Sequence, residues 1–148
     1  MTKTWILVAN ASQANIYEGN PKLEKSLDRI KSLAHPESRQ KNTDLVADKG
    51  GNFSATGHGT MNQDTDPKTV EEAKFAKEII QLLQSAHNSN KFDKLILIAG
   101  PHFLGLIRKP LASHLNGALD GVIEKDYTQT ELSSIVQKIR EDIYPFYA

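Results

Sequence analysis

Residues 66–100, DPKTVEEAKFAKEIIQLLQSAHNSNKFDKLILIAG, contain a helical pattern followed by a short apolar run. Asp66 and Pro67 supply a helix cap and a first-turn proline. Apolar side chains then recur at helical spacing, at Val70, Ala73, Phe75, Ala76, Ile79, Ile80, Leu82 and Leu83. We expect a helix to about residue 86, and residues 95–99 as a strand buried on both faces. Such a strand is typical of a parallel sheet that is covered by helices.

The N-terminal residues predict an antiparallel meander. Residues 4–9, TWILVA, have the composition of a buried strand and end at the turn-forming residues Asn10-Ala11-Ser12. Residues 14–18 then return as the hairpin partner. After a turn at residues 19–21, residues 23–32 predict a third strand.

The C-terminal residues alternate between helical and strand patterns. Pro110 is expected to break the helix that follows Gly100-Pro101, giving pieces at residues 102–106 and 110–116. Residues 121–125 predict the last strand, and Thr128 with Glu131 forms a capping box before a final amphipathic helix. The chain is therefore predicted to be an α/β protein of one domain, residues 1–148. Its mixed sheet of about five strands has an N-terminal antiparallel meander followed by helix-strand-helix-strand-helix.

Composition excludes several classes of function. Eighteen Lys and Arg residues balance eighteen Asp and Glu residues, so the molecule as a whole is not attracted to nucleic acid, and we expect no DNA partner. Cysteine is absent, which excludes disulfides and thiol chemistry. The apolar runs are too short for a signal peptide or a bilayer-crossing helix. We expect a cytoplasmic protein with no membrane span and no cofactor, and the oligomeric state stays open.

A polar segment at about residues 39–66 is the first candidate site. It holds four of the nine glycines, in Gly50-Gly51-Asn52 and Gly57-His58-Gly59, and has few large apolar residues. Compact domains rarely carry so long a flexible loop without a use for it. Gly50 and Gly51 would let the backbone approach a substrate closely, or they form a flexible tip without a partner.

Other residues of this segment carry weaker signals. Lys49 precedes the glycines as a candidate partner contact, but no lysine and hydroxyl pair follows them, so a P-loop is excluded. His58 could act as an acid or base, although such a histidine is more often simply solvated. Asp64 and Asp66 resemble a metal pair, but Asp66 is already the helix cap, and we predict no metal site.

Two further groups could contact a partner. His35 precedes a proline and lies close in sequence to Glu37 and Arg39, a mixed-charge patch that binds a partner or holds the start of the loop in place. Arg108 and Lys109 form a local excess of positive charge, with His102 and His114 nearby and no acidic residue between residues 95 and 119. They would face RNA phosphates or be solvated. A third possibility is a small-molecule site near residues 100–105, at the carboxyl ends of the parallel strands.

Several runs of residues resemble the bacterial host attachment protein family. They cover nearly the whole chain and comprise residues 5–10, 14–18, 35–39, 44–45, 75–78, 103–108 and 125–128, WILVAN, ANIYE, HPESR, DL, FAKE, FLGLIR and KDYT. The family's name implies a role in, or upstream of, attachment to a host cell. The absence of an export signal argues against a direct surface adhesin but permits a non-enzymatic interaction or regulatory module.

That family is more distantly similar to the middle domain of class I release factors of eukaryotes and archaea. The resemblance implies a fold related to the ribonuclease H-like architecture, with a loop that carries Gly-Gly-Gln. Gly50-Gly51-Asn52 stands at the corresponding place, and Asn52 is one methylene shorter than glutamine. The resemblance implies contact with the ribosome, tRNA or another RNA. Whether the protein is an enzyme stays open: binding is favoured over catalysis, and any activity would resemble peptidyl-tRNA hydrolysis.

Overall fold

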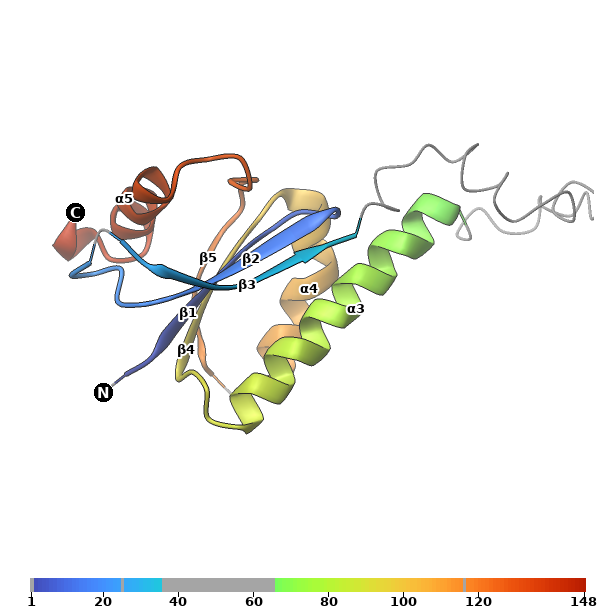
Figure 1. Ribbon diagram of the computed structural model, residues 1–148, viewed down its shortest axis with the longest axis horizontal. Helices are drawn as coiled ribbons and strands as arrows, with labels where there is room; N and C mark the ends of the chain where they lie inside the picture. The colour runs from blue at the N-terminus through green and yellow to red at the C-terminus, as the bar shows by residue number, and fades with distance from the viewer. Residues whose placement is uncertain (1, 25, 36–65, 116) are drawn as a thin grey trace, which may run out of the picture.

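The centre of the fold is β1 (Thr4–Ala9), a strand that is buried on both faces. It pairs antiparallel with β2 (Gln13–Glu18) and parallel with β4 (Lys94–Ala99). The computed structural model describes residues 2–24, 26–35, 66–115 and 117–148. Within them the strand order is β3-β2-β1-β4-β5, with β3 (Asp28–Ala34) and β5 (Leu119–Ile123) at the edges (Figure 1).

The directions of the strands confirm the predicted mixed sheet. β2 is antiparallel to both of its neighbours, whereas β4 and β5 run parallel to β1. Parallel neighbouring strands need a crossover connection. The chain between β3 and β4 and the chain between β4 and β5 each contain a helix that provides such a crossover. This strand order and these directions are those of the ribonuclease H-like architecture that the resemblance implies.

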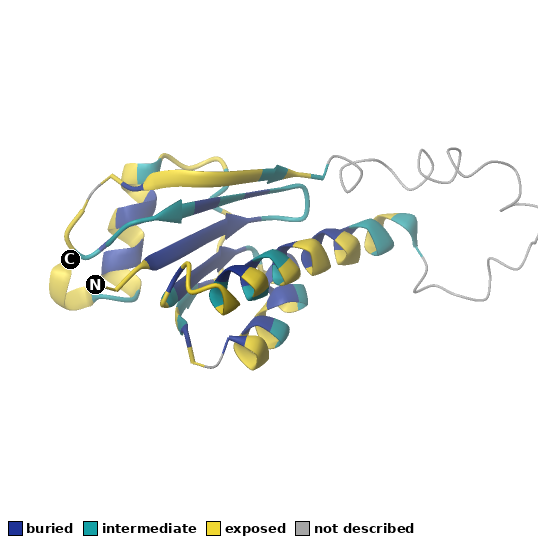
Figure 2. Ribbon diagram, turned by 60° about the horizontal axis from the view of Figure 1, so that its bottom comes forward, coloured by how far each residue is buried: buried dark blue, intermediate teal, exposed yellow. Residues whose placement is uncertain are grey.

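Helices cover both faces of the sheet. α3 (Pro67–Asn88) and α4 (Pro101–His114) pack on one face, and α5 (Leu132–Asp142) packs on the other, followed by the short η4 (Pro145–Tyr147). Alternate side chains of β1 point to opposite faces, as the pleat of a strand requires. Trp5 and Leu7 join the cluster under α3 and α4, and Ile6 and Val8 join the one under α5. Figure 2 shows the buried central strands beside the exposed β3.

α3 begins where the sequence predicts. Asp66 Oδ1 accepts a hydrogen bond from Lys68 N at 3.2 Å, and Pro67 occupies the first turn. The buried side of α3 differs slightly from the predicted stripe: Ala73 is exposed, and Glu72 is one of the buried residues of the helix. A carboxylate in such a place requires a partner.

The predicted third strand is shifted along the chain. It was expected at residues 23–32, but β3 begins at Asp28, and Leu23 lies in a turn with 74% of its surface exposed. Leu23 N and Glu24 N both donate to Asn20 O in this turn. Because β3 is an exposed edge strand, its apolar residues carry no core-facing period that would fix its ends.

The predicted break at Pro110 is wrong. α4 runs without interruption from Pro101 to His114 and contains Pro110 in its interior. Phe103, Leu104, Ile107 and Leu111 are buried on both sides of the proline along the helix. Their packing outweighs the loss of one backbone hydrogen bond.

The start of the final helix and the last strand also differ from expectation. β5 begins at Leu119, two residues earlier than predicted. α5 begins at Leu132, and its cap Glu131 makes no side-chain capping bond, so the predicted capping box is wrong. Thr128 instead donates from N and Oγ1 to Asp126 Oδ1, at 3.0 and 2.6 Å. The Thr128 hydroxyl, which the capping box would use, is instead hydrogen-bonded within a local turn.

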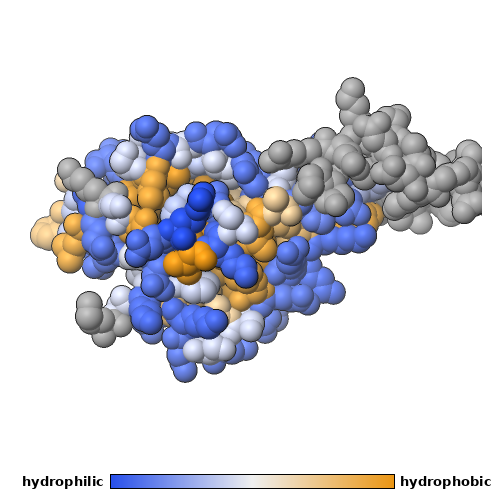
Figure 3. Space-filling model, in the orientation of Figure 1, coloured by the Kyte–Doolittle hydropathy of each residue, from blue (hydrophilic) through white to orange (hydrophobic). Residues whose placement is uncertain are grey.

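Hydropathy is mixed over the surface in Figure 3, where hydrophilic side chains are interrupted by small apolar areas. The most exposed large apolar residues are Leu23 and Phe146, at 74% and 90%. Among the helices of the described segments, none has the length and apolar character to cross a bilayer.

Candidate functional site

Three turns meet at the carboxyl ends of the parallel strands. Asn10 follows β1, Gly100 follows β4, and Asp126 lies in the turn after β5. A Cβ atom built on Gly100 would lie 3.6 Å from Asp126 Cβ, so the last two turns touch. Ligands of open α/β sheets bind at this edge. We call it the carboxyl edge.

Asn10 links two of these turns through its side chain. Its Nδ2 donates to Asp126 Oδ2 and to Thr128 Oγ1, each at 3.1 Å. Its Oδ1 accepts from Ser12 N at 2.8 Å and from Gln13 N at 3.0 Å, which closes the turn between β1 and β2. The amide is therefore held at both ends, and the carboxyl edge is pre-organised.

His35 directly follows β3 and is held at the carboxyl edge by hydrogen bonds. Its N–H donates to Ser12 O at 2.7 Å, and its Nε2 lies 2.9 Å from Glu71 Oε1 on α3. The imidazole also stacks on the buried ring of Phe75, with ring centroids 5.3 Å apart. These contacts fix the last described residue before residues 36–65.

A second histidine is paired in the same way. His102, in the first turn of α4, places Nε2 2.9 Å from Glu72 Oε1. Glu72 has only 10% of its side chain exposed, whereas His102 has 70% exposed. Adjacent glutamates of α3 thus hold one histidine from the end of β3 and another from α4. A histidine that is oriented by a carboxylate can act as a general base, and such a pair also occurs as a purely structural contact.

Comparison with known proteins shows what the chain resembles. A family described as "Protein required for attachment to host cells" matches residues 5–139. The chain belongs to this family. It is 27% identical over 107 residues to an uncharacterized protein of Rickettsia prowazekii (strain Madrid E), and the match covers 71% of this chain and 68% of that protein.

Among solved structures, this host attachment protein is similar to the Aquifex aeolicus Ppx/GppA phosphatase. The TM-score is 0.37 at 6% identity, over 84% of this chain and 36% of the phosphatase chain. The chain thus spans about a third of the length of that structure.

The predicted glycine site of this host attachment protein lies outside the described residues, as do Arg39, Lys49, Gly50, Gly51, Asn52 and His58. The two ends of that segment are described. His35 contacts Glu71 and Phe75, and Asp66 caps the same helix. Both ends of the segment therefore lie at the N-terminal turns of α3, at one end of the molecule (Figure 1).

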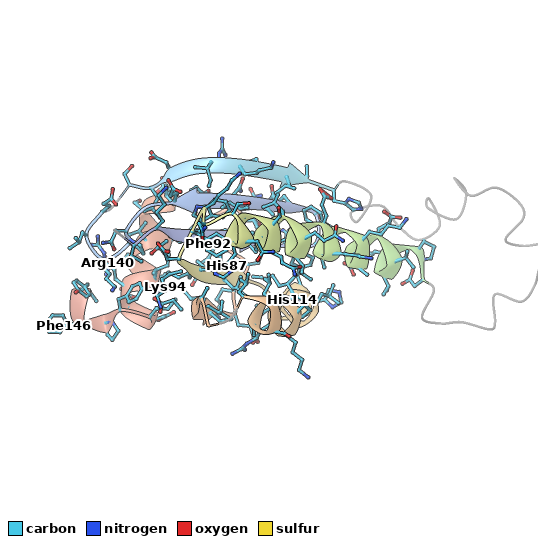
Figure 4. The ribbon with its side chains drawn as sticks, turned by 90° about the horizontal axis from the view of Figure 1, so that it is seen from below. His87, Phe92, Lys94, His114, Arg140 and Phe146 are labelled. Atoms are coloured by element: carbon cyan, nitrogen blue, oxygen red, sulfur yellow. The ribbon has the colours of Figure 1, made fainter. Side chains whose placement is uncertain are left out.

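The predicted positive group lies on α4. Arg108 and Lys109 are both exposed. A seven-residue spacing puts Lys109 on the same side of α4 as His102, about 10 Å further along the helix. His114 lies at the far end of α4 and points to solvent in Figure 4.

Sequence reasoning missed Glu72 and Asn10. The signal for Glu72 is its position: it lies three and four residues before Phe75 and Ala76, on the buried side of α3. For Asn10 the only local signal is a turn, because its partners Asp126 and Thr128 are more than a hundred residues away.

Hydrogen bonds set the protonation of two carboxylates at this edge. The hydrogen bond from His35 holds the pKa of Glu71 below its usual 4.5, helped by Lys74 and opposed by burial. Burial alone would raise the pKa of Asp126, but hydrogen bonds from Thr128 and Asn10 outweigh burial, and the net shift is downward from 3.8. Both groups are carboxylates at neutral pH.

The Glu71 shift predicts a pH dependence of stability. A depressed folded-state pKa contributes stability that is present above the unfolded pKa, near 4.5, and is lost as pH falls through the folded pKa. We therefore expect Glu71→Gln and His35→Ala to lose less stability than the parent protein between pH 6 and pH 3. Urea unfolding followed by circular dichroism at each pH measures this. A Glu71→Gln profile as steep as the parent's would contradict the pairing.

Proposed function

We propose that this protein is a release-factor-like module that contacts the ribosome, tRNA or another RNA through the segment at residues 36–65 and the exposed side of α4. The observation that supports this most is that the residues on both sides of that segment are held by α3. His35 is hydrogen-bonded to Glu71, and Asp66 caps the helix. A loop that meets a partner works best from a rigid base.

The charge of α4 supports RNA as the partner. Its fourteen residues contain no aspartate or glutamate, and Arg108 and Lys109 are exposed on it. Exposed cations without neighbouring carboxylates on the same helix are available to phosphates. Binding is the proposed activity, because Asn52 is shorter than the glutamine of the release loop that the segment resembles.

Cosedimentation with ribosomes from native lysate tests this proposal. We expect the parent protein to pellet with ribosomes at low salt and Arg108→Glu/Lys109→Glu to bind about tenfold more weakly or worse. The double variant should also have a smaller slope of log affinity against log salt, by about 2, because each phosphate contact contributes about one unit.

The matched control is Arg29→Glu/Lys31→Glu, which makes the same charge change on exposed residues of β3. It should cosediment as the parent does. A parent protein that stays in the supernatant under every growth and stress condition contradicts the proposal. Equal loss in both double variants shows a net-charge effect and contradicts the assignment to α4.

The family's description favours a second candidate, a non-enzymatic interaction module that acts in attachment to host cells. Fractionation of intact cells separates the two candidates. Native protein on the cell surface would favour attachment and contradict ribosome work, whereas protein found only with ribosomes would favour the first candidate.

A further inference from the structure

A cavity of about 690 Å³ lies at the opposite end of the sheet from the carboxyl edge. It is bounded by the amino ends of β1 and β4, the turn that contains residues 19–24, and Tyr144 after α5. Its volume falls within the range of about 300–1,000 Å³ that is typical of small-molecule sites. None of the carboxyl-edge residues lines it.

The walls of this cavity are held in place. Thr4, on its sheet side, is buried, and Thr4 O accepts a hydrogen bond from Gly19 N at 3.2 Å. The buried guanidinium of Arg140 fixes the turn: Nε donates to Pro21 O at 2.7 Å and Nη2 to Glu24 O at 3.1 Å. Arg140 and Lys94 lie at the same end of the molecule in Figure 4. The cavity is therefore largely pre-formed.

Six charged side chains line the cavity, and the carboxylates among them are bonded to uncharged donors. Glu18 Oε2 accepts from Trp5 Nε1 at 2.9 Å, and Glu24 Oε1 accepts from Asn20 N at 2.8 Å. Asp120 Oδ2 accepts from the Tyr144 hydroxyl. These bonds orient the carboxylates and leave their other lone pairs for a ligand.

The cations of the cavity are Lys3, Lys22 and Lys94. Across residues 2–24, 26–35, 66–115 and 117–148, no carboxylate lies within 4.0 Å of their ammonium groups. Lys22 Nζ lies 4.8 Å from the centre of the Tyr144 ring. Three lysines that line one cavity therefore have no ion-pair partner among the described residues.

We propose that this cavity binds a phosphorylated sugar. The phosphate would be the missing counter-ion of the ammonium groups, and sugar hydroxyls would donate to the oriented carboxylates. Inorganic phosphate carries at most two hydroxyl donors at neutral pH, too few for the three carboxylates. A neutral sugar would leave the three ammonium groups unpaired.

Isothermal titration calorimetry with ribose 5-phosphate tests the proposal, with ribose and inorganic phosphate as comparison ligands. We expect saturable binding of ribose 5-phosphate, at least tenfold tighter than that of either comparison ligand. Lys22→Gln and Lys94→Gln should each weaken it by about tenfold to a hundredfold, the usual range for losing a charge-assisted hydrogen bond. The Lys77→Gln variant, which changes an exposed residue of α3 that does not line the cavity, should bind as the parent does.

Glu18→Gln separates a sugar phosphate site from a plain anion site. Glutamine can still accept from Trp5 Nε1, so the wall is retained, but it is a weaker acceptor for a sugar hydroxyl and carries no charge. The variant should bind ribose 5-phosphate more weakly and inorganic phosphate as tightly or more tightly. Tighter binding of both would show an anion site only and overturn the proposal. Absence of saturable binding by the folded parent would overturn it as well.

Discussion

Replacing Phe75 with alanine is expected to lower the free energy of unfolding by about 3–5 kcal/mol. The side chain is completely buried on α3, and its ring lies 5.9 Å from that of Phe103 and 5.3 Å from that of His35. The substitution removes buried apolar surface and leaves a cavity where α3, α4 and the end of β3 meet. Urea unfolding at pH 7, followed by circular dichroism, measures the loss.

Phe146→Ala is the matched control, because the same atoms are removed from a side chain that is 90% exposed. It should change stability by no more than about 0.5 kcal/mol. Equal effects of the two substitutions would contradict the packing of α3. A double-mutant cycle with His35→Ala should show coupling to Phe75→Ala, since the two rings are stacked.

Replacing Arg140 with methionine is expected to lower the free energy of unfolding by about 2–6 kcal/mol. Methionine keeps the apolar stem but leaves Pro21 O and Glu24 O without their donor, and each unsatisfied carbonyl costs about 1–3 kcal/mol. The turn that contains these residues should also become more mobile. Urea unfolding gives the first effect, and amide hydrogen exchange of Leu23 and Glu24 gives the second.

Lys138→Met, two residues away on the same helix, removes a positive charge from an exposed side chain. It should be within about 0.5 kcal/mol of the parent. If Arg140→Met were equally harmless, water would be satisfying both carbonyls, and Arg140 would not be what holds the turn.

The centre of the fold could be predicted because burial leaves a strong pattern there. The runs WILVA and LILIA are apolar without interruption, since β1 and β4 are covered on both faces. The bounds of β3 and the continuity of α4 through Pro110 could not be predicted in the same way. An exposed edge strand has little pattern, and the continuity of α4 depends on tertiary packing that overrides the local effect of a proline.

The candidate site was predictable only in part. The sequence predicts that His35 holds the start of the loop in place or contacts a partner, because it precedes a proline and charged residues. The structure adds its contacts with Glu71 and Phe75. The pair of His102 with Glu72 depends on how α3 lies against α4, which no local pattern reveals. The glycine motif and its neighbours stay predictions from the sequence.

The pairing of β1 with β4 has a consequence for synthesis of the chain. Thr4 pairs with Lys94, so β1 emerges from the ribosome long before its central neighbour exists. At about 5–20 residues per second, the delay is roughly 5–18 s. During that time β1 can form its hairpin with β2. The other edge of β1, which later pairs with β4, remains unpaired, and the apolar side chains of β1 remain uncovered. The nascent protein is therefore expected to need a chaperone at its first strand until residue 99 has been made.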